Sequence, residues 1–96
     1  MNFWVYMLQC ADRSYYVGHT DELEKRVLQH ERGECGGYTS THRPVRLVFT
    51  QAFALREEAL AAELQIKGWS RKKKEALVQG DWAEMSRLAQ RRKPFR

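Results

Sequence analysis

Two short runs of aromatic and β-branched residues open the chain, and they constrain its fold more than any other feature. The runs are Phe3–Leu8 and Ser14–Gly18, and residues 9–13 separate them. Aromatic and β-branched side chains favour the pleated surface of a strand, so two such runs this close together predict a β-hairpin. Tyr6 and Tyr16 then lie on neighbouring strands, along which side chains alternate between the two faces of the sheet.

Further along the chain, the spacing of apolar residues predicts four helices and a third strand. The predicted elements are a helix over residues 21–32, a strand over 45–53 and helices over 55–67, 70–79 and 81–88, with a loop over 34–43. Asp21 and Ser70 stand at helix starts as predicted caps, and Gly33, Gly68 and Gly80 stand where helices should end. The order strand, strand, helix, strand, helix, helix, helix indicates an α+β domain.

The length of 96 residues has room for one domain with a modest core. We expect residues 1–90 to form this domain and residues 91–96 to form a basic tail. No run approaches the roughly 18 consecutive apolar residues of a membrane span. Cys10 and Cys35 are too few for a disulfide framework and lack CxxC spacing, which predicts free thiols and a cytoplasmic protein.

Positive charge points to a polyanionic partner, most simply nucleic acid. The chain has 17 Lys and Arg against 12 Asp and Glu, a formal net charge of +5. The densest basic run is Arg71-Lys72-Lys73-Lys74. Such a run can bind phosphates, and it can equally be the solvated face of a helix.

Five side chains provide the groups that phosphodiester cleavage requires. The reaction needs a group that activates the nucleophile, a fixed cation and usually a carboxylate that holds a metal. Arg26 and His30 are four residues apart on one predicted helix face. Glu63 lies at the edge of a predicted apolar stripe on the helix over 55–67, where an acid without a partner is costly. The stripe consists of Leu55, Ala59, Ala62 and Ile66. Tyr6 and Tyr16 are the candidates for the group that activates the nucleophile.

Each of these residues also has a plain structural interpretation. Two strand tyrosines are commonly packing residues, and His30 alone would be a cation that complements a helix C-terminus. Glu63 alone would pair with Lys67 at i+4 on an exposed helix.

The residues nevertheless carry a family resemblance. Trp4-Val5-Tyr6 and Tyr16-Val17-Gly18 resemble the two signature triplets of the GIY-YIG nuclease superfamily, with Trp4 in place of a glycine. The resemblance covers almost the whole chain and is greatest to small stand-alone bacterial members. It continues through His19, Arg26, His30, the Tyr38-Thr39 and Arg43-Pro44 loop, and the pair Glu63 and Lys67.

The resemblance implies a three-stranded antiparallel sheet flanked by helices and a metal-dependent DNA endonuclease, with a role in DNA repair or processing. Tyr6 would act as general base toward water, Arg26 would bind the scissile phosphate, and Glu63 would hold one Mg²⁺ or Mn²⁺. Tyr16 would orient the phosphate or the nucleophile, and His30 would contact the phosphate or transfer a proton. The candidates for further phosphate contact are His19, Lys67, Arg71, Lys72, Lys73 and Lys74.

Two features separate this chain from the larger relatives. Those often have an asparagine downstream of the metal-binding glutamate, whereas the only asparagine here is Asn2. They also rely on an extra DNA-binding domain, so target choice here should be low or come from a protein partner. The leading hypothesis is a nuclease acting on branched, damaged or single-stranded DNA. The alternatives are a nucleic-acid-binding module of the same fold with little or no hydrolytic activity, and a protein-interaction domain.

Overall fold

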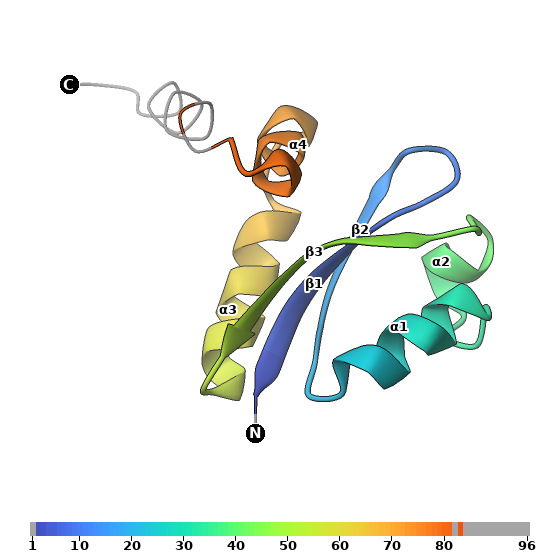
Figure 1. The fold of residues 1–96 in the computed structure, drawn as a ribbon, viewed down its shortest axis with the longest axis horizontal. Coiled ribbons are helices and arrows are strands. Elements are labelled where there is room, and N and C mark those ends of the chain that lie inside the picture. Colours follow the sequence, from blue (N-terminus) through green and yellow to red (C-terminus); the bar gives the residue numbers. More distant parts are fainter. Residues whose placement is uncertain (1, 82, 84–96) are drawn as a thin grey trace.

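The computed structural model describes residues 2–81 and 83, and these residues form an α+β fold (Figure 1). Its elements are β1 (Phe3–Gln9), β2 (Tyr15–Thr20), α1 (Leu23–Glu31), α2 (Gly37–Ser40), β3 (Arg46–Phe53), α3 (Arg56–Lys67) and α4 (Arg71–Gln79). The strands form one antiparallel sheet in the order β2-β1-β3, so β1 is central and β2 is an edge strand. The predicted fold class is therefore confirmed.

The central strand separates two hydrophobic clusters, because its side chains alternate between the faces of the sheet. Val5 and Met7 face α3, where Ala59 and Ile66 complete the larger cluster with residues of β2 and α4. Tyr6 and Leu8 face the other way, toward the side that α1 and α2 cover in Figure 1. All four β1 residues are almost fully buried. The sheet is thus covered on both faces, which gives a three-stranded sheet the packing it needs to be stable.

Helix starts and ends agree with the sequence at α4 and differ at α1. The Ser70 side chain accepts a hydrogen bond from the Lys73 backbone N–H at 3.2 Å, and Gly80 ends α4 with φ of 71°. Asp21 was predicted to cap α1, but the cap residue is Glu22 and its side chain makes no capping bond. The Thr20 hydroxyl instead accepts a hydrogen bond from the Glu22 backbone N–H at 3.0 Å.

The predicted loop over residues 34–43 contains the one-turn helix α2, which sequence patterns did not indicate. Gly36 and Gly37 enter this helix with φ of 68° and 64°, a left-handed conformation that suits glycine. Both cysteines are free, Cys10 buried and Cys35 exposed. The helix expected over 81–88 and the tail 91–96 lie outside the described residues. No helix in the described part is long and apolar enough to cross a membrane.

Candidate active site

The predicted catalytic residues Tyr6 and His30 form a buried hydrogen-bonded pair. The Tyr6 hydroxyl oxygen lies 2.8 Å from His30 Nε2, and the two residues are 1% and 2% exposed. The other ring nitrogen, His30 Nδ1, lies 2.7 Å from the hydroxyl oxygen of Thr39, which is also buried. A continuous chain of hydrogen bonds therefore joins three elements: β1 contributes Tyr6, α1 contributes His30 and α2 contributes Thr39.

A missing side chain on β2 makes room for the Tyr6 ring. Gly18 is directly opposite Tyr6 in the antiparallel ladder. A Cβ atom placed on Gly18 would lie 2.6 Å from the Tyr6 hydroxyl oxygen and 2.7 Å from its ring carbon Cζ. The third residue of the second triplet is thus a glycine because the tyrosine of the first triplet crosses over it.

Tyr16 and Arg26 complete the group on this face of the sheet. The Tyr16 ring centroid lies 5.1 Å from that of His30 and 6.4 Å from that of Tyr6. Arg26 is one helical turn before His30, and its guanidinium is close enough to the Tyr6 hydroxyl to act against the effect of burial on the pKa of that group. Four of the five predicted catalytic and metal-binding residues therefore lie together.

Burial keeps both members of the central pair uncharged at neutral pH. Burial, and to a smaller extent Tyr16, raises the pKa of Tyr6 above its ordinary value of 10.0, although Arg26 acts in the opposite direction. Burial lowers the pKa of His30 below its ordinary value of 6.5, and the charge of Arg26 lowers it further. A tyrosinate is thus disfavoured, and the neutral imidazole is the better proton acceptor of the two.

Glu63 lies on the opposite face of the sheet, within the core that α3 closes. It is 7% exposed, and each of its carboxylate oxygens has a side-chain partner. Lys67 Nζ lies 2.7 Å from Oε2, and His19 Nδ1 donates a short hydrogen bond to Oε1. Burial alone would raise the pKa of Glu63, but the hydrogen bonds and charges of Lys67 and His19 outweigh it and lower that pKa.

The edge strand β2 is where the two groups approach each other. Side chains alternate along it, so Tyr16 and Gly18 face the Tyr6 group whereas His19 faces Glu63. Tyr16 is close enough to Lys67 to contribute to the raised pKa of that lysine, after the larger effect of Glu63. Sequence spacing did not indicate this division.

The apolar stripe predicted for α3 also requires correction. Leu55 was predicted to lie in it together with Ala59, Ala62 and Ile66, but Leu55 precedes the helix and is 55% exposed. Glu63, placed at the edge of the stripe by sequence, is buried between Ala59 and Ile66 along the helix. The sequence predicted an ion pair of Glu63 and Lys67 on an exposed helix. The pair forms, but Glu63 is buried.

The basic candidates on α4 lie on the same side of the sheet as α3. Arg71 donates to Glu75 at 3.1 Å and lies over the Tyr15 ring, 5.3 Å from its centroid. Lys73 Nζ lies 4.3 Å from the Trp69 ring centroid. Lys72 is exposed and Lys74 half-buried. Their contact with phosphate stays a prediction.

Glu63 is suited to be the single carboxylate ligand of a metal ion, although Lys67 already contacts its carboxylate. Among residues 2–81 and 83, no three His, Cys, Asp or Glu side chains gather to hold a metal ion. Mg²⁺ commonly keeps several waters and takes only one or two carboxylates, and a carboxylate has about four lone-pair positions. The lowered pKa keeps Glu63 ionised, so it is able to accept a cation, which would share the carboxylate with Lys67.

The pairing of the two triplets across β1 and β2 agrees with a comparison to known families. The sequence model of the GIY-YIG catalytic domain matches residues 2–76. The chain belongs to the GIY-YIG family. This family is one of nucleases, which makes nucleic acid the class of substrate that its members share.

Relatives and solved structures agree with the family assignment. The UPF0213 protein BH0048 of Halalkalibacterium halodurans is 45% identical over 78 residues, covering 81% of this chain and 83% of that protein. The UPF0213 protein YazA of Bacillus subtilis is 41% identical over 78 residues, covering 81% of this chain and 79% of that protein. The solution NMR structure of BH0048 from Bacillus halodurans matches with a TM-score of 0.55 at 44% identity, over 82% of this chain and 84% of that one. The solution NMR structure of EF2693 from E. faecalis has a TM-score of 0.58 at 34% identity, over 86% of this chain and 88% of that one.

Two contributors to the site were given no role by sequence reasoning. Thr39 fixes His30 from α2, and its signal was its position inside the Tyr38-Thr39 loop of the resemblance. Gly18 provides the space for Tyr6, and its signal was a glycine inside a predicted strand, which often marks a close approach of another group.

Proposed function

We propose that this protein is a metal-dependent endonuclease that hydrolyses DNA phosphodiester bonds with Tyr6, His30 and Arg26. The observation that carries the proposal is the buried pair of the Tyr6 hydroxyl and His30 Nε2, 2.8 Å apart, with a guanidinium beside it. A proton acceptor and a fixed cation in one group are the elements that phosphoryl transfer uses.

The neutral state of the pair supports a relay rather than a free tyrosinate. In one tautomer His30 Nδ1–H donates to the Thr39 hydroxyl, and Nε2 accepts the Tyr6 proton. As an attacking water gives its proton to the Tyr6 oxygen, Tyr6 passes its own proton to His30. The hydroxide then forms the new bond to phosphorus, and the leaving oxygen departs with the electron pair of the broken bond. Tyr6 is uncharged before and after the step, which its raised pKa requires.

Arg26 and Tyr16 are assigned to the phosphate. The guanidinium of Arg26 would bind two phosphate oxygens and stabilise the charge that develops on them. Tyr16, on the edge strand β2, would orient the phosphate. Glu63 lies on the other face of the sheet from Arg26, so it would serve the phosphate at the β2 edge, where Tyr16 approaches Lys67. There it would hold the divalent ion, Mg²⁺ or Mn²⁺, which when bound would neutralise phosphate charge.

The substrate and the cellular role that we propose are those expected from the sequence. The net charge of +5 supports a polyanionic ligand, and the basic side chains on α4 would contact backbone phosphates outside the reaction site. We assign the protein to DNA repair or processing in the cytoplasm, on branched, damaged or single-stranded DNA. A protein partner would provide the target choice.

The second candidate function is a nucleic-acid-binding module with little hydrolytic activity. The observation that favours it is the double engagement of the Glu63 carboxylate, by Lys67 at Oε2 and by His19 at Oε1. If these contacts keep the cation out, the fold would bind DNA in a salt-dependent way and leave it uncut.

A cleavage assay on three DNA forms separates the two functions. Supercoiled plasmid, a branched junction and a single strand are incubated with Mg²⁺, with Mn²⁺ and with EDTA. The proposal predicts nicking that needs metal and falls about 10²-fold or more in Arg26→Ala. Lys25→Ala removes the same charge from the neighbouring exposed position and should cut at the wild-type rate. Binding without cleavage under all conditions would favour the second function.

A further inference from the structure

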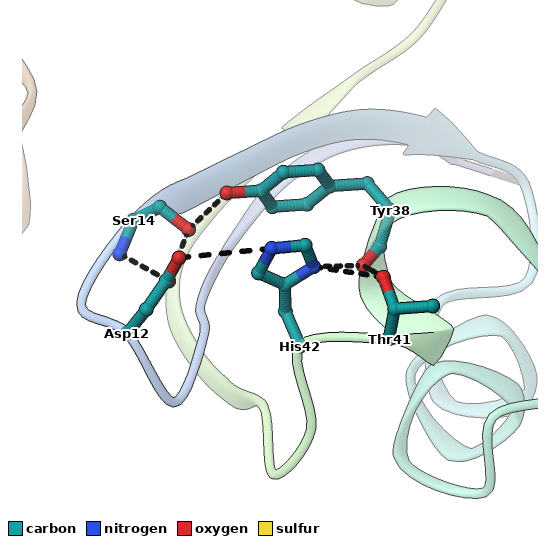
Figure 2. Close-up of polar contacts among 5 residues, drawn as sticks. All are labelled: Asp12, Ser14, Tyr38, Thr41 and His42. Carbon is teal, nitrogen blue, oxygen red and sulfur yellow. Dashed lines mark hydrogen bonds and ion pairs between the residues drawn. The ribbon is translucent and has the colours of Figure 1, made fainter.

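A second aromatic group, Tyr38 and His42, lies beside the connection between β1 and β2 that carries Asp12 and Ser14 (Figure 2). The rings of Tyr38 and His42 are stacked, with centroids 3.9 Å apart and planes inclined by 11°. Tyr38 is 42% exposed even though His42 covers one of its faces. The residue thus keeps exposed surface beside the stack.

A hydrogen bond at its hydroxyl end fixes the Tyr38 ring against the hairpin. Its hydroxyl donates to Ser14 Oγ at 2.5 Å, and Ser14 Oγ donates in turn to Asp12 Oδ1 at 2.5 Å (Figure 2). The Asp12 carboxylate also accepts from the Ser14 backbone N–H at 3.0 Å. An exposed tyrosine normally has two free side-chain torsions, and this one is held at its far end.

The ring beneath Tyr38 is fixed as well. His42 Nδ1 lies 2.7 Å from the Tyr38 backbone oxygen, and because a carbonyl only accepts, Nδ1 is the donor. His42 Nε2 faces Asp12 Oδ2 at 3.7 Å. The Thr41 hydroxyl donates to the same Tyr38 oxygen at 3.1 Å. The two rings thus form one preorganised unit rather than two mobile surface side chains.

This unit is connected directly to the Tyr6 group. Thr39, the residue after Tyr38, hydrogen-bonds His30. Ser14, which accepts the Tyr38 hydrogen bond, directly precedes β2, the strand that carries Tyr16. Arg13 and Arg43, both exposed, immediately follow Asp12 and His42 in the chain. An exposed aromatic pair linked to a phosphate-binding group, on a basic domain, is the combination that binds single-stranded nucleic acid.

We propose that Tyr38 and His42 form a stacking platform for an unpaired DNA base that flanks the phosphate held by Arg26. The inference rests on the proposed function and specifies its substrate: DNA in which at least one nucleotide near the cut is unpaired. A base inside a continuous duplex is stacked on its neighbours and does not present a face to Tyr38. The platform therefore selects single strands, loops and flaps over intact duplex.

Binding measurements without metal test the platform directly. A labelled single-stranded oligonucleotide and the matching duplex are titrated in EDTA at low salt, so that no cleavage occurs. Tyr38→Leu should weaken single-strand binding about tenfold and leave duplex binding unchanged. Tyr38→Phe keeps the ring and loses only the bond to Ser14, so it should retain most of the affinity. An oligonucleotide containing 2-aminopurine should be quenched by the wild type and by Tyr38→Phe, and less by Tyr38→Leu.

The outcomes separate this inference from the proposed function. If Tyr38→Leu binds the single strand as tightly as the wild type, or loses single strand and duplex equally, there is no platform, although cleavage by Arg26 and Tyr6 is unaffected. If the wild type binds neither form at low salt, both the inference and the proposed function are wrong. Thermal unfolding of each variant shows whether it folds. Should Tyr38→Leu fail to fold, Tyr38→Ser in the same assays replaces it, with the same expectations.

Discussion

Gly18 lies directly opposite Tyr6 across the β1–β2 ladder, and a Cβ atom on Gly18 would come within 2.6 Å of the Tyr6 hydroxyl oxygen. Because the Tyr6 ring is buried, it has little room to move aside. Gly18→Ala should therefore destabilise the fold by about 1–3 kcal/mol, as overpacking does, and displace the hydroxyl from His30. Denaturant unfolding and plasmid nicking measure the two effects. Gly68→Ala is the control, because its nearest contact would be an ordinary 3.5 Å.

Thr39 should matter to the site through His30 alone. Thr39→Val keeps the shape of the buried side chain and leaves His30 Nδ1 without its partner at 2.7 Å. A buried polar group without a partner costs about 1–3 kcal/mol, so unfolding in urea should show a loss of that size. Thr39→Ser retains the hydroxyl and should stay close to the wild type. Equal stability of all three proteins would contradict the hydrogen-bond chain.

Acid should destabilise the protein through His30. Its folded pKa is lowered below the ordinary 6.5, so the unfolded chain takes up the proton first. The stability that neutral His30 contributes is complete above pH 6.5 and is lost as the pH falls below that value. The free energy of unfolding of the wild type should drop between pH 7.5 and 5.5, and His30→Gln should drop less. NMR titration of the ring checks the direction of the shift, which an upward shift would contradict.

Metal binding at Glu63 should respond to Lys67. The ammonium 2.7 Å from Oε2 competes with any cation for the carboxylate. Lys67→Met should therefore tighten Mn²⁺ binding, measured by the loss of the free-ion EPR signal, and Glu63→Gln should abolish it. Glu75→Gln, which removes a half-buried carboxylate paired with Arg71, is the control and should bind Mn²⁺ as the wild type does. Unchanged Mn²⁺ binding in Glu63→Gln would place the metal elsewhere.

The sheet and the two residue pairs of the Tyr6 group followed from sequence because local signals determine them. Two strand runs of six and five residues with a short connection predicted the hairpin that carries Tyr6 and Tyr16, and i, i+4 spacing placed Arg26 and His30 on one helix face. The family resemblance is what joined the two pairs in one site. The cap at Ser70 and the end at Gly80 are also local, because each depends on hydrogen bonds within a few residues.

The rest depends on contacts between distant segments. Glu63 reaches His19 across 44 residues of sequence, and no pattern within α3 shows that its carboxylate is buried on the far side of the sheet. The loop over 34–43 has the composition of a turn, yet its one helical turn is what presents Thr39 to His30. The spacing of residues along the chain does not show on which face of the sheet the Glu63 carboxylate lies, nor which group the Thr39 hydroxyl binds.

Nicking of supercoiled plasmid by Tyr6→Phe beside the wild type tests whether the Tyr6 hydroxyl takes part in cleavage. Phenylalanine keeps the buried ring over Gly18 and removes only the hydroxyl that bonds His30 Nε2. We expect nicking by the wild type in Mg²⁺ or Mn²⁺ and a loss of about 10²–10⁴-fold in Tyr6→Phe, with DNA binding retained. Wild-type protein that cuts no DNA with either metal, or Tyr6→Phe that cuts at the wild-type rate, would contradict this expectation.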